Sequence, residues 1–279
     1  MADRRERRHR ADISPDTRQD QYFLEDSRVI ERTIAYAHDA AFPFDHVLEI
    51  GPGTGALTAH LLDEATKLTV IERDLDLVAF LEREFAEAIQ TGQLTIQAGD
   101  ATADPLPSFD ACISNLPYGV SSPLIFRLLP EQRPLLVMVQ REFGERMAAT
   151  PGSDAYGRLS VSAQHFGEIA VLEIVPPSVF TPQPAVDSAI VRVLPREPTY
   201  TVTDEAFFLD VTKAIFTQRR KTLRNALRNT THISGIDDAA GVIDELPSDV
   251  LSQRPGVLSP ATFAQIANIA NRYRKHDER

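Results

Sequence analysis

Glu49-Ile50-Gly51-Pro52-Gly53-Thr54-Gly55 is the stretch that decides the fold of this chain, because it joins an apolar strand, His46 to Ile50, to a helix that begins near Thr54. Glycine has no Cβ, so the backbone at such a turn can bend sharply and lie close to a ligand. We therefore take Glu49, Gly51, Gly53 and Gly55 as candidate ligand-contacting residues. By itself, the motif also fits a dinucleotide site or a simple tight turn.

Strands and helices alternate along the chain around this turn. Amphipathic helices are predicted over Asp26 to Ala40 and over Leu75 to Ile89. The strand-like runs that follow the turn are LTVIE (68–72), LTIQAGD (94–100), FDACISN (109–115) and PLLVMVQ (134–140). Short apolar strands separated by helices predict a parallel sheet covered on both faces, which is a doubly wound α/β fold.

The last two strands break this alternation. The runs EIAVLEIV (168–175) and DSAIVRVL (187–194) are joined by the proline-rich segment Pro176 to Ala185 without a helix, so we expect them to pair antiparallel. Seven strands with such a terminal pair are typical of the Rossmann-like S-adenosylmethionine-dependent methyltransferases rather than of the nicotinamide dehydrogenases. The sheet therefore favours S-adenosyl-L-methionine as the cofactor.

Three parts are expected along the chain. Residues 1–20 are rich in arginine and have no hydrophobic period, so we interpret them as a flexible basic arm that either touches RNA or is a plain disordered tail. Residues 21–196 are expected to form the S-adenosylmethionine-binding catalytic domain. Residues 197–279 are expected to form a small helical domain, whose last helix starts with Ser259 as N-cap and Pro260 in the first turn.

Acidic residues dominate the composition. The formal net charge is −11, and four lysines and 25 arginines stand against 40 acids. This bias resembles proteins adapted to high internal salt, and it argues against nucleic acid unless the basic residues gather locally. We see no candidate membrane span or secretory signal and expect a cytoplasmic protein. The single cysteine, Cys112, is expected to be buried on a strand, and no metal site is expected.

Two acids follow the glycine turn at successive strand ends. Glu72 closes LTVIE, where a carboxylate can accept hydrogen bonds from both hydroxyls of a ribose. Asp100 closes the next strand, where a carboxylate can accept a bond from an adenine amino group. A dinucleotide site accounts for Glu72 but not for Asp100. Solvated acids at strand ends are the alternative for each residue.

The fourth strand ends in Asn115-Leu116-Pro117-Tyr118, which matches the motif of methyltransferases that act on amino groups. The N6 lone pair of adenine is delocalised into the ring, so the amine becomes nucleophilic only when hydrogen-bond acceptors draw it toward tetrahedral geometry. The Asn115 side-chain oxygen and the Leu116 carbonyl can be these acceptors. Pro117 restricts the backbone that carries the carbonyl, and Tyr118 can stack on the base.

With these motifs, the chain resembles the small-subunit ribosomal RNA adenine dimethyltransferase family, the KsgA type, in an archaeal-like and halophilic form. Further matching segments are Gln21-Tyr22-Phe23-Leu24, Pro177 to Ser188 and Phe216 to Arg224. The resemblance implies that Phe180 holds the target adenine from the face opposite Tyr118. It also implies that the cofactor is contacted by Tyr22, Leu24, Gly51, Glu72, Asp100, Ala101 and Asn115. The family usually has Asn or His at the position of Tyr22, so one polar contact is altered here or comes from the main chain.

A basic segment follows in the helical part. Arg220, Arg224 and Arg228 have the four-residue spacing of one helical face, with Arg219 and Lys221 adjacent. The resemblance implies that this face binds ribosomal RNA, and the alternative is a solvated helix face.

Four functions compete. The favoured one is dimethylation of the N6 amines of two adjacent adenosines in a hairpin loop near the 3′ end of small-subunit (16S) rRNA, by a monomer acting on the 30S subunit or its precursor. A large-subunit rRNA adenine N6-methyltransferase is less well matched by Val186-Asp187-Ser188 and Gln218 to Lys221. A DNA adenine methyltransferase would carry a separate target-recognition region. A mainly non-catalytic ribosome assembly factor would not need an intact Asn115 and Tyr118.

Overall fold

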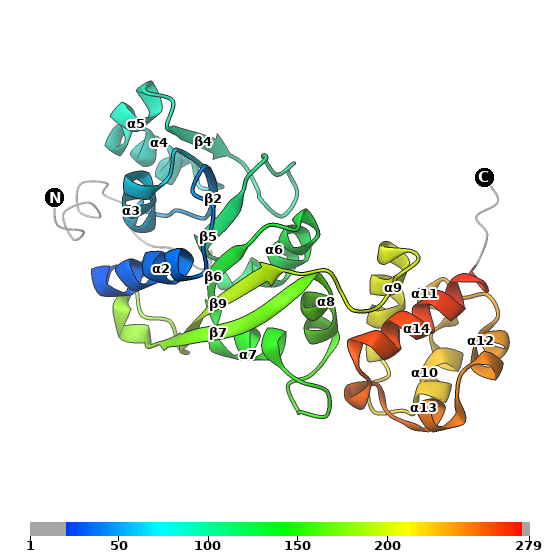
Figure 1. Ribbon diagram of the computed structural model, residues 1–279. Coiled ribbons are helices and arrows are strands. Elements are labelled where there is room, and N and C mark those ends of the chain that lie inside the picture. Colours follow the sequence, from blue (N-terminus) through cyan, green and yellow to red (C-terminus); the bar gives the residue numbers. More distant parts are fainter. Residues whose placement is uncertain (1–20, 275–279) are drawn as a thin grey trace. The chain divides into compact units, whose positions relative to one another are not determined.

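The computed structural model of the chain describes residues 21–274 and contains a seven-stranded sheet (Figure 1). The expected basic arm, residues 1–20, lies outside the described residues. The strands, in spatial order, are β4 (Leu94–Ala98), β3 (Lys67–Glu72), β2 (His46–Ile50), β5 (Ala111–Asn115), β6 (Leu135–Gln140), β9 (Ser188–Pro195) and β7 (Gly167–Val175).

The order of the strands places the carboxyl ends of five parallel strands side by side. Strand β2 pairs in parallel with β3 and β5, β3 pairs in parallel with β4, and β5 pairs in parallel with β6. Strand β9 runs antiparallel to β6 and lies between β6 and β7, so the last two predicted strands are neighbours. The seven-stranded Rossmann-like α/β fold is thus confirmed. Its parallel half brings Ile50, Glu72, Ala98 and Asn115 to one edge.

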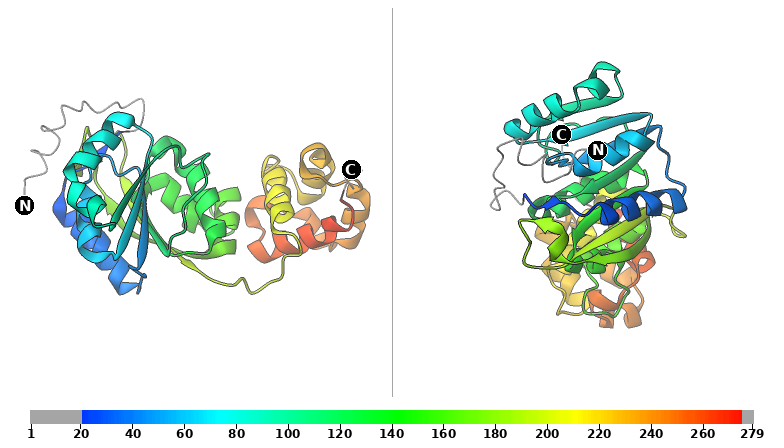
Figure 2. Two further views of the ribbon diagram at one scale, coloured as in Figure 1. Left: turned by 90° about the horizontal axis from the view of Figure 1, so that it is seen from above. Right: turned by 90° about the vertical axis from the view of Figure 1, so that its left-hand side faces the viewer.

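Helices flank the sheet on both faces (Figure 2). Two of them begin at side chains that satisfy the first free N–H groups: the Asp26 side chain accepts from Arg28 N at the start of α2, and the Asp74 side chain accepts from Asp76 N at the start of α4. Their bounds are α2 (Ser27–Asp39), α3 (Ala56–Glu64), α4 (Leu75–Glu84), α5 (Ala86–Gln90), α6 (Ser121–Leu128) and α7 (Arg141–Ala148).

One predicted helix is interrupted. The helix expected over Leu75 to Ile89 ends at Glu84, and α5 begins after Phe85, whose backbone is not helical (φ −112°, ψ 27°). The Phe85 side chain is buried and lies directly against the backbone of Gly55. Burial of this aromatic ring accompanies the break, and the helical period alone did not reveal it.

A second, two-stranded sheet joins distant parts of the chain. Strand β1 (Phe23–Leu24) pairs antiparallel with β8 (Phe180–Thr181), with Leu24 opposite Phe180. Both strands are only two residues long, which is too short for a sequence period to indicate them. Cys112 is fully buried on β5, as expected.

The chain forms two compact units. Unit 1 comprises 21–144 and Ile169–Pro195, and unit 2 comprises Glu145–Glu168 and 196–274. This division differs from the expected boundaries, 21–196 and 197–279, because Tyr156 is fully buried in the core of unit 2. Its hydroxyl donates to the Leu258 carbonyl at 2.8 Å, and its ring packs edge-on against Phe216.

Unit 2 is helical, as predicted for the end of the chain. Its last helix begins as expected, with the Ser259 hydroxyl accepting from Thr262 N and Pro260 in the first turn. Within residues 21–274, no helix has both the length and the apolar composition needed to cross a lipid bilayer. The helices of unit 2 are α8 (Arg158–Phe166), α9 (Glu205–Phe216), α10 (Leu223–Asn229), α11 (Thr231–Ser234), α12 (Ala239–Glu245), α13 (Ser248–Ser252) and α14 (Pro260–Asn271).

Candidate cofactor and active site

A cavity of about 330 Å³ lies at the carboxyl edge of the parallel strands in unit 1. Its size is within the range of pockets that hold small ligands. The ends of β2, β3, β4 and β5 and the segment that leads into β1 all contribute to its wall. The predicted site residues that line it are Tyr22, Leu24, Glu49, Gly51, Gly53, Glu72, Asp100, Ala101, Asn115 and Pro117.

The glycine turn is packed tightly against two neighbouring side-chain rings, those of Pro117 and Phe23. Gly51 and Gly53 both have positive φ, +67° and +57°. A Cβ on Gly51 would lie 3.2 Å from the Pro117 ring, and a Cβ on Gly53 would lie 2.8 Å from the Phe23 ring. Both glycines therefore allow the turn to approach neighbouring elements and still line the cavity.

Gly55 differs from the other two glycines. It does not line the cavity, and its predicted cofactor contact stays a prediction. It is the N-cap of α3 with φ +77°, and a Cβ here would lie 2.5 Å from the Phe85 ring. The positive φ and the contact with Phe85 are sufficient to account for a glycine at this position.

Glu72 is a buried carboxylate held by the backbone around it. Its Oε1 accepts from Asp74 N at 2.9 Å, and its Oε2 accepts from Gly53 N at 3.4 Å. Burial raises the pKa of Glu72, while these N–H donors oppose the shift. The side chain is thus fixed between the glycine turn and the start of α4, where it can accept bonds from two adjacent hydroxyls.

Glu49 lies at the floor of the same cavity. It is 1% exposed, and its Oε2 accepts a hydrogen bond from the Thr58 hydroxyl at 2.7 Å. Burial raises the pKa of Glu49 to about 8. At neutral pH this side chain is therefore mostly a neutral carboxylic acid that can donate as well as accept a hydrogen bond.

Asp100 presents the opposite electrostatic case. Its Oδ1 accepts from both the backbone N and the hydroxyl of Thr102, at 2.8 and 2.7 Å. These bonds are the main reason why the pKa of Asp100 lies below its usual value, so the group is ionised at neutral pH. Within residues 21–274 no donor is bonded to its other oxygen, which can therefore accept a bond from an amino group in the cavity.

Asn115 carries the most informative atom of the site. Its Nδ2 donates to the Tyr22 carbonyl at 3.4 Å, whereas its Oδ1 is buried and has no hydrogen-bond partner among the described residues. A buried acceptor without a donor costs about 1–3 kcal/mol. The site therefore retains an unsatisfied acceptor that a ligand N–H could satisfy.

The rest of the tetrapeptide is held rigidly. Leu116 is buried and its N–H donates to the Met138 carbonyl on β6 at 3.0 Å. The Ser121 hydroxyl, in the first turn of α6, donates to the Pro117 carbonyl at 2.9 Å. These bonds fix the backbone on both sides of Pro117.

The two predicted base-holding rings do not line the cavity in this structure. Tyr118 stacks on Tyr22, with ring centroids 5.5 Å apart, and its hydroxyl is hydrogen-bonded to the buried hydroxyl of Ser188. Phe180 is 2% exposed and packs in the core of unit 1, because its strand pairs with β1. The predicted arrangement, with Phe180 opposite Tyr118 across a base, is therefore not seen here.

Several lining residues were not predicted from the sequence. Asp74 caps α4 and accepts from Gln21 Nε2 at 2.8 Å, which ties the segment before β1 to the cavity wall. Its position two residues after Glu72, ahead of an apolar run, is an N-cap signal that could have placed it here. The other unpredicted lining residues include Gln21, Thr54, Arg73, Thr102 and Val120.

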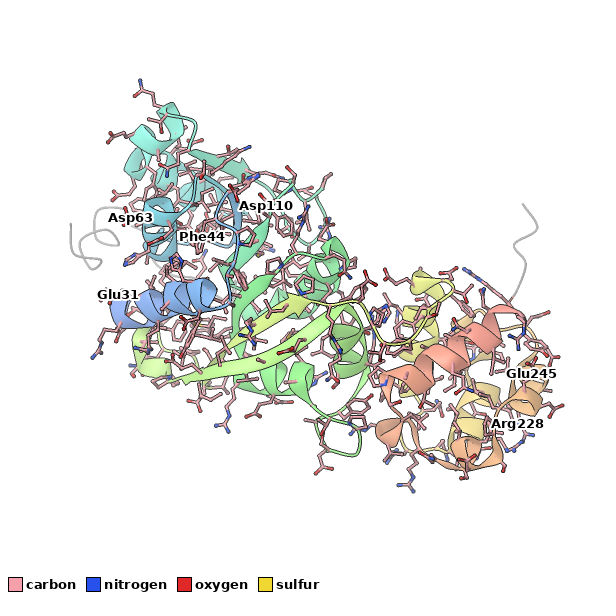
Figure 3. The ribbon with its side chains drawn as sticks, viewed as in Figure 1. Glu31, Phe44, Asp63, Asp110, Arg228 and Glu245 are labelled. Atoms are coloured by element: carbon pink, nitrogen blue, oxygen red, sulfur yellow. The ribbon has the colours of Figure 1, made fainter. Side chains whose placement is uncertain are left out.

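The basic segment of unit 2 does not form a single helical face, which corrects our prediction. Helix α9 ends at Phe216, residues 217–222 form a turn, and only Arg224 and Arg228 lie on α10. Arg220 and Lys221 are exposed in the turn, and the exposed Arg228 lies on the surface of unit 2 (Figure 3). Arg219 Nη2 donates to the Asp154 carbonyl at 2.7 Å.

Comparison with known sequences extends the match beyond the motifs. A family described as ribosomal RNA adenine dimethylase matches residues 15–245. A protein of Haloquadratum walsbyi named ribosomal RNA small subunit methyltransferase A is 58% identical over 94% of this chain and 88% of its own length. A protein of the same name from Natronomonas pharaonis is 56% identical over 94% of this chain and 95% of its own length.

Two solved structures of methyltransferases are similar to this chain over most of its length. A dimethyladenosine transferase from Plasmodium falciparum is similar with a TM-score of 0.73 and 28% identity, over 90% of this chain and 98% of that one. The 23S rRNA methyltransferase ErmE is similar with a TM-score of 0.63 and 25% identity, over 89% of this chain and 99% of that one.

Proposed function

The chain belongs to the ribosomal RNA adenine dimethylase family, and from this premise we propose that it dimethylates the N6 amines of adenines in small-subunit ribosomal RNA. The methyl donor is S-adenosyl-L-methionine. The relatives that match nearly the whole chain are named as small-subunit methyltransferases, which favours the small subunit over the large one.

The single observation that carries the chemistry is the unsatisfied Asn115 Oδ1. Its Nδ2 donates to the Tyr22 carbonyl, so the amide is held in place and its buried oxygen has no donor among the described residues. The exocyclic amine of adenine is such a donor. We infer that Asn115 Oδ1 and the Leu116 carbonyl accept the two N6 hydrogens before the first transfer, and that one of them accepts the single remaining hydrogen before the second, so that the nitrogen lone pair becomes available each time.

The other cavity residues fit the proposed cofactor. When bound, S-adenosylmethionine supplies an activated methyl group on a positively charged sulfur. In this proposal Glu72 accepts bonds from the ribose hydroxyls, the ionised Asp100 accepts a bond from the cofactor's adenine amine, and the glycine turn lies under the methionine part. The protein's contribution is then mainly positioning of the amine in line with the methyl group, and no strong general base is needed.

The target base must leave its helical stack, because an N6 amine inside a duplex cannot reach the cavity. We propose that Tyr118 then stacks on the base, an interaction worth about 1–3 kcal/mol. Since Tyr22 covers Tyr118 in this structure, the base either uses the other face of the ring or displaces Tyr22.

The finer substrate follows from the family resemblance. We propose two adjacent adenosines in a hairpin loop near the 3′ end of small-subunit rRNA, methylated by a monomer on the 30S subunit or its precursor in the cytoplasm. The basic residues of unit 2 are proposed to hold RNA phosphates: Arg219, Arg220, Lys221, Arg224 and Arg228.

The test is methyl incorporation in high salt from labelled S-adenosylmethionine into small subunits that lack this modification, with naked rRNA and DNA in parallel. We expect label as N6,N6-dimethyladenosine in small-subunit rRNA. Asn115→Ala should lower incorporation about 100-fold or more while binding to the subunit persists, because a positioned acceptor is lost but the RNA surface is not. Asn271→Ala, at the end of α14, is the matched control and should stay active.

Two outcomes would contradict the proposal. Label found on DNA or on large-subunit rRNA would assign another substrate. Wild-type protein that binds small subunits and leaves them unlabelled would favour the assembly-factor alternative.

A further inference from the structure

Arg127, on α6, directs its charged side chain to two backbone carbonyls. Its Nη1 donates to the Ala101 carbonyl at 2.6 Å, and its Nη2 donates to the Asp104 carbonyl at 2.7 Å. Both bonds are partly buried and short, as expected for a charged donor. The planar guanidinium can donate to two acceptors at once, which a lysine ammonium does less well.

The segment that Arg127 contacts is the turn after β4, which forms one end of the cavity. Asp100, Ala101 and Thr102 line the cavity, and Ala101 is buried. Within the turn, the Asp104 carboxylate accepts from Asp100 N at 2.7 Å. The turn is therefore closed on itself, and the Arg127 fork ties it to a helix of the unit.

The same helix is tied to the tetrapeptide at its other end. Helix α6 begins at Ser121, whose hydroxyl donates to the Pro117 carbonyl at 2.9 Å. The Leu124 and Ile125 side chains of α6 are buried, so the helix is anchored by apolar packing independently of Arg127. Helix α6 thus links Pro117 of the tetrapeptide with the turn that carries Asp100.

We propose that Arg127 is a positioning residue that holds the 100–104 turn at the distance from the tetrapeptide that the cofactor's adenosyl group requires. The inference rests on the proposed function, because the adenosyl group is assigned to this end of the cavity there. The positive charge of Arg127 also helps to keep Asp100 ionised, as one of the smaller contributions to its lowered pKa.

The predicted defect is specific to the adenosyl end. Arg127→Met retains much of the apolar stem but removes both donors, so the turn should move and the adenine contacts should weaken. We expect the Kd for S-adenosylhomocysteine, the Kd for adenosine and the KM for S-adenosylmethionine to rise about tenfold, equivalent to about 1.4 kcal/mol. The kcat at saturating cofactor should change less than threefold, because Asn115 to Tyr118 are untouched.

Two further variants separate positioning from general stability. Arg127→Lys keeps the charge and at least one donor, so it should recover part of the lost affinity. Arg133→Met removes an exposed arginine whose ion pair with Asp110 is long, 3.8 Å, and it should leave all three constants unchanged. All variants are compared at a temperature well below their unfolding midpoints.

Calorimetric binding and steady-state kinetics on small subunits give distinct outcomes. Unchanged Kd values for S-adenosylhomocysteine and adenosine in Arg127→Met would overturn the proposal, and so would a loss of kcat with unchanged KM. Wild-type protein that binds S-adenosylhomocysteine but transfers no methyl group to rRNA would overturn the proposed function instead, while the binding comparison would still decide the role of Arg127.

Discussion

Glu49 shows how a single residue in the cavity links pH to stability. Its carboxyl group is fully buried, and its pKa is raised from 4.5 to about 8 by burial. Between these values the unfolded chain releases the proton while the folded chain retains it. The free energy of unfolding therefore falls as pH rises through this window, and the stabilising effect of protonation is complete only below pH 4.5.

Glu49→Gln should remove this pH dependence, because glutamine occupies similar space and does not ionise. The variant should gain stability relative to the wild type between pH 5 and pH 8, by about 1.4 kcal/mol for each unit of pKa shift realised. Denaturant unfolding at pH 5, 6.5 and 8 in constant high salt measures the difference. Glu82→Gln, exposed on α4, is the control, and parallel curves for wild type and Glu49→Gln would contradict the expectation.

At the scale of elements, the contact between α3 and the break before α5 depends on Gly55. Gly55→Ala should destabilise the fold by about 2–4 kcal/mol, because the new Cβ meets the Phe85 ring and the backbone keeps a positive φ. Gly92→Ala is a matched control, since Gly92 has φ +79° and open space around it. It should cost only the backbone part, about 1–2 kcal/mol. Equal losses in denaturant unfolding would show that the ring contact is unimportant.

The elements also explain which features could be predicted from the sequence. Strands such as β2 and β3 are short segments rich in Val, Leu and Ile, and the parallel order places Glu72 and Asp100 at one edge, so the cavity could be predicted from local patterns. The pairing of β1 with β8 could not be predicted, because it joins two two-residue strands far apart in sequence. That pairing is what buries Phe180, and a non-local contact of this kind leaves no period to detect.

The prediction of a single basic helical face was wrong for a related reason. Four-residue spacing of Arg220, Arg224 and Arg228 is necessary for one helical face, but it does not show that the helix is continuous. Thr222 has extended backbone (φ −65°, ψ 156°) and starts a new helix, α10. A face that is broken by a turn can still present cations to RNA, but from two elements rather than one.

At the scale of the whole molecule, the surface is mostly acidic, and basic residues gather at a few places only. The chain carries a formal net charge of −11, and exposed acids such as Glu31 and Asp63 lie on the surface of unit 1, and Glu245 on that of unit 2 (Figure 3). A molecule with this surface can bind phosphate only where cations gather, as in 219–228. The net charge therefore affects solubility and the response to salt, whereas the local cations determine whether RNA can bind.

The division into two units leads to the last prediction. Tyr156 and Val161, from Glu145–Glu168, share a buried cluster with Phe208 and Phe263 of the helical end. A fragment that begins at residue 197 lacks them, and removal of one large buried side chain alone costs about 3–5 kcal/mol. Small domains have total stabilities of about 5–15 kcal/mol.

Residues 197–279 alone should therefore show helical circular dichroism without a cooperative unfolding transition, whereas a chain that joins 145–168 to 196–279 through a flexible linker should unfold cooperatively. Tyr156→Ala in the joined chain should weaken that transition, since it removes the ring contact with Phe216 and the bond to the Leu258 carbonyl. Thermal unfolding followed by circular dichroism in high salt measures the transition of the 197–279 fragment, of the joined chain and of its Tyr156→Ala variant. A sharp, reversible melt of 197–279 alone would instead support a domain boundary at 196, because the helical end would then carry a sufficient core of its own.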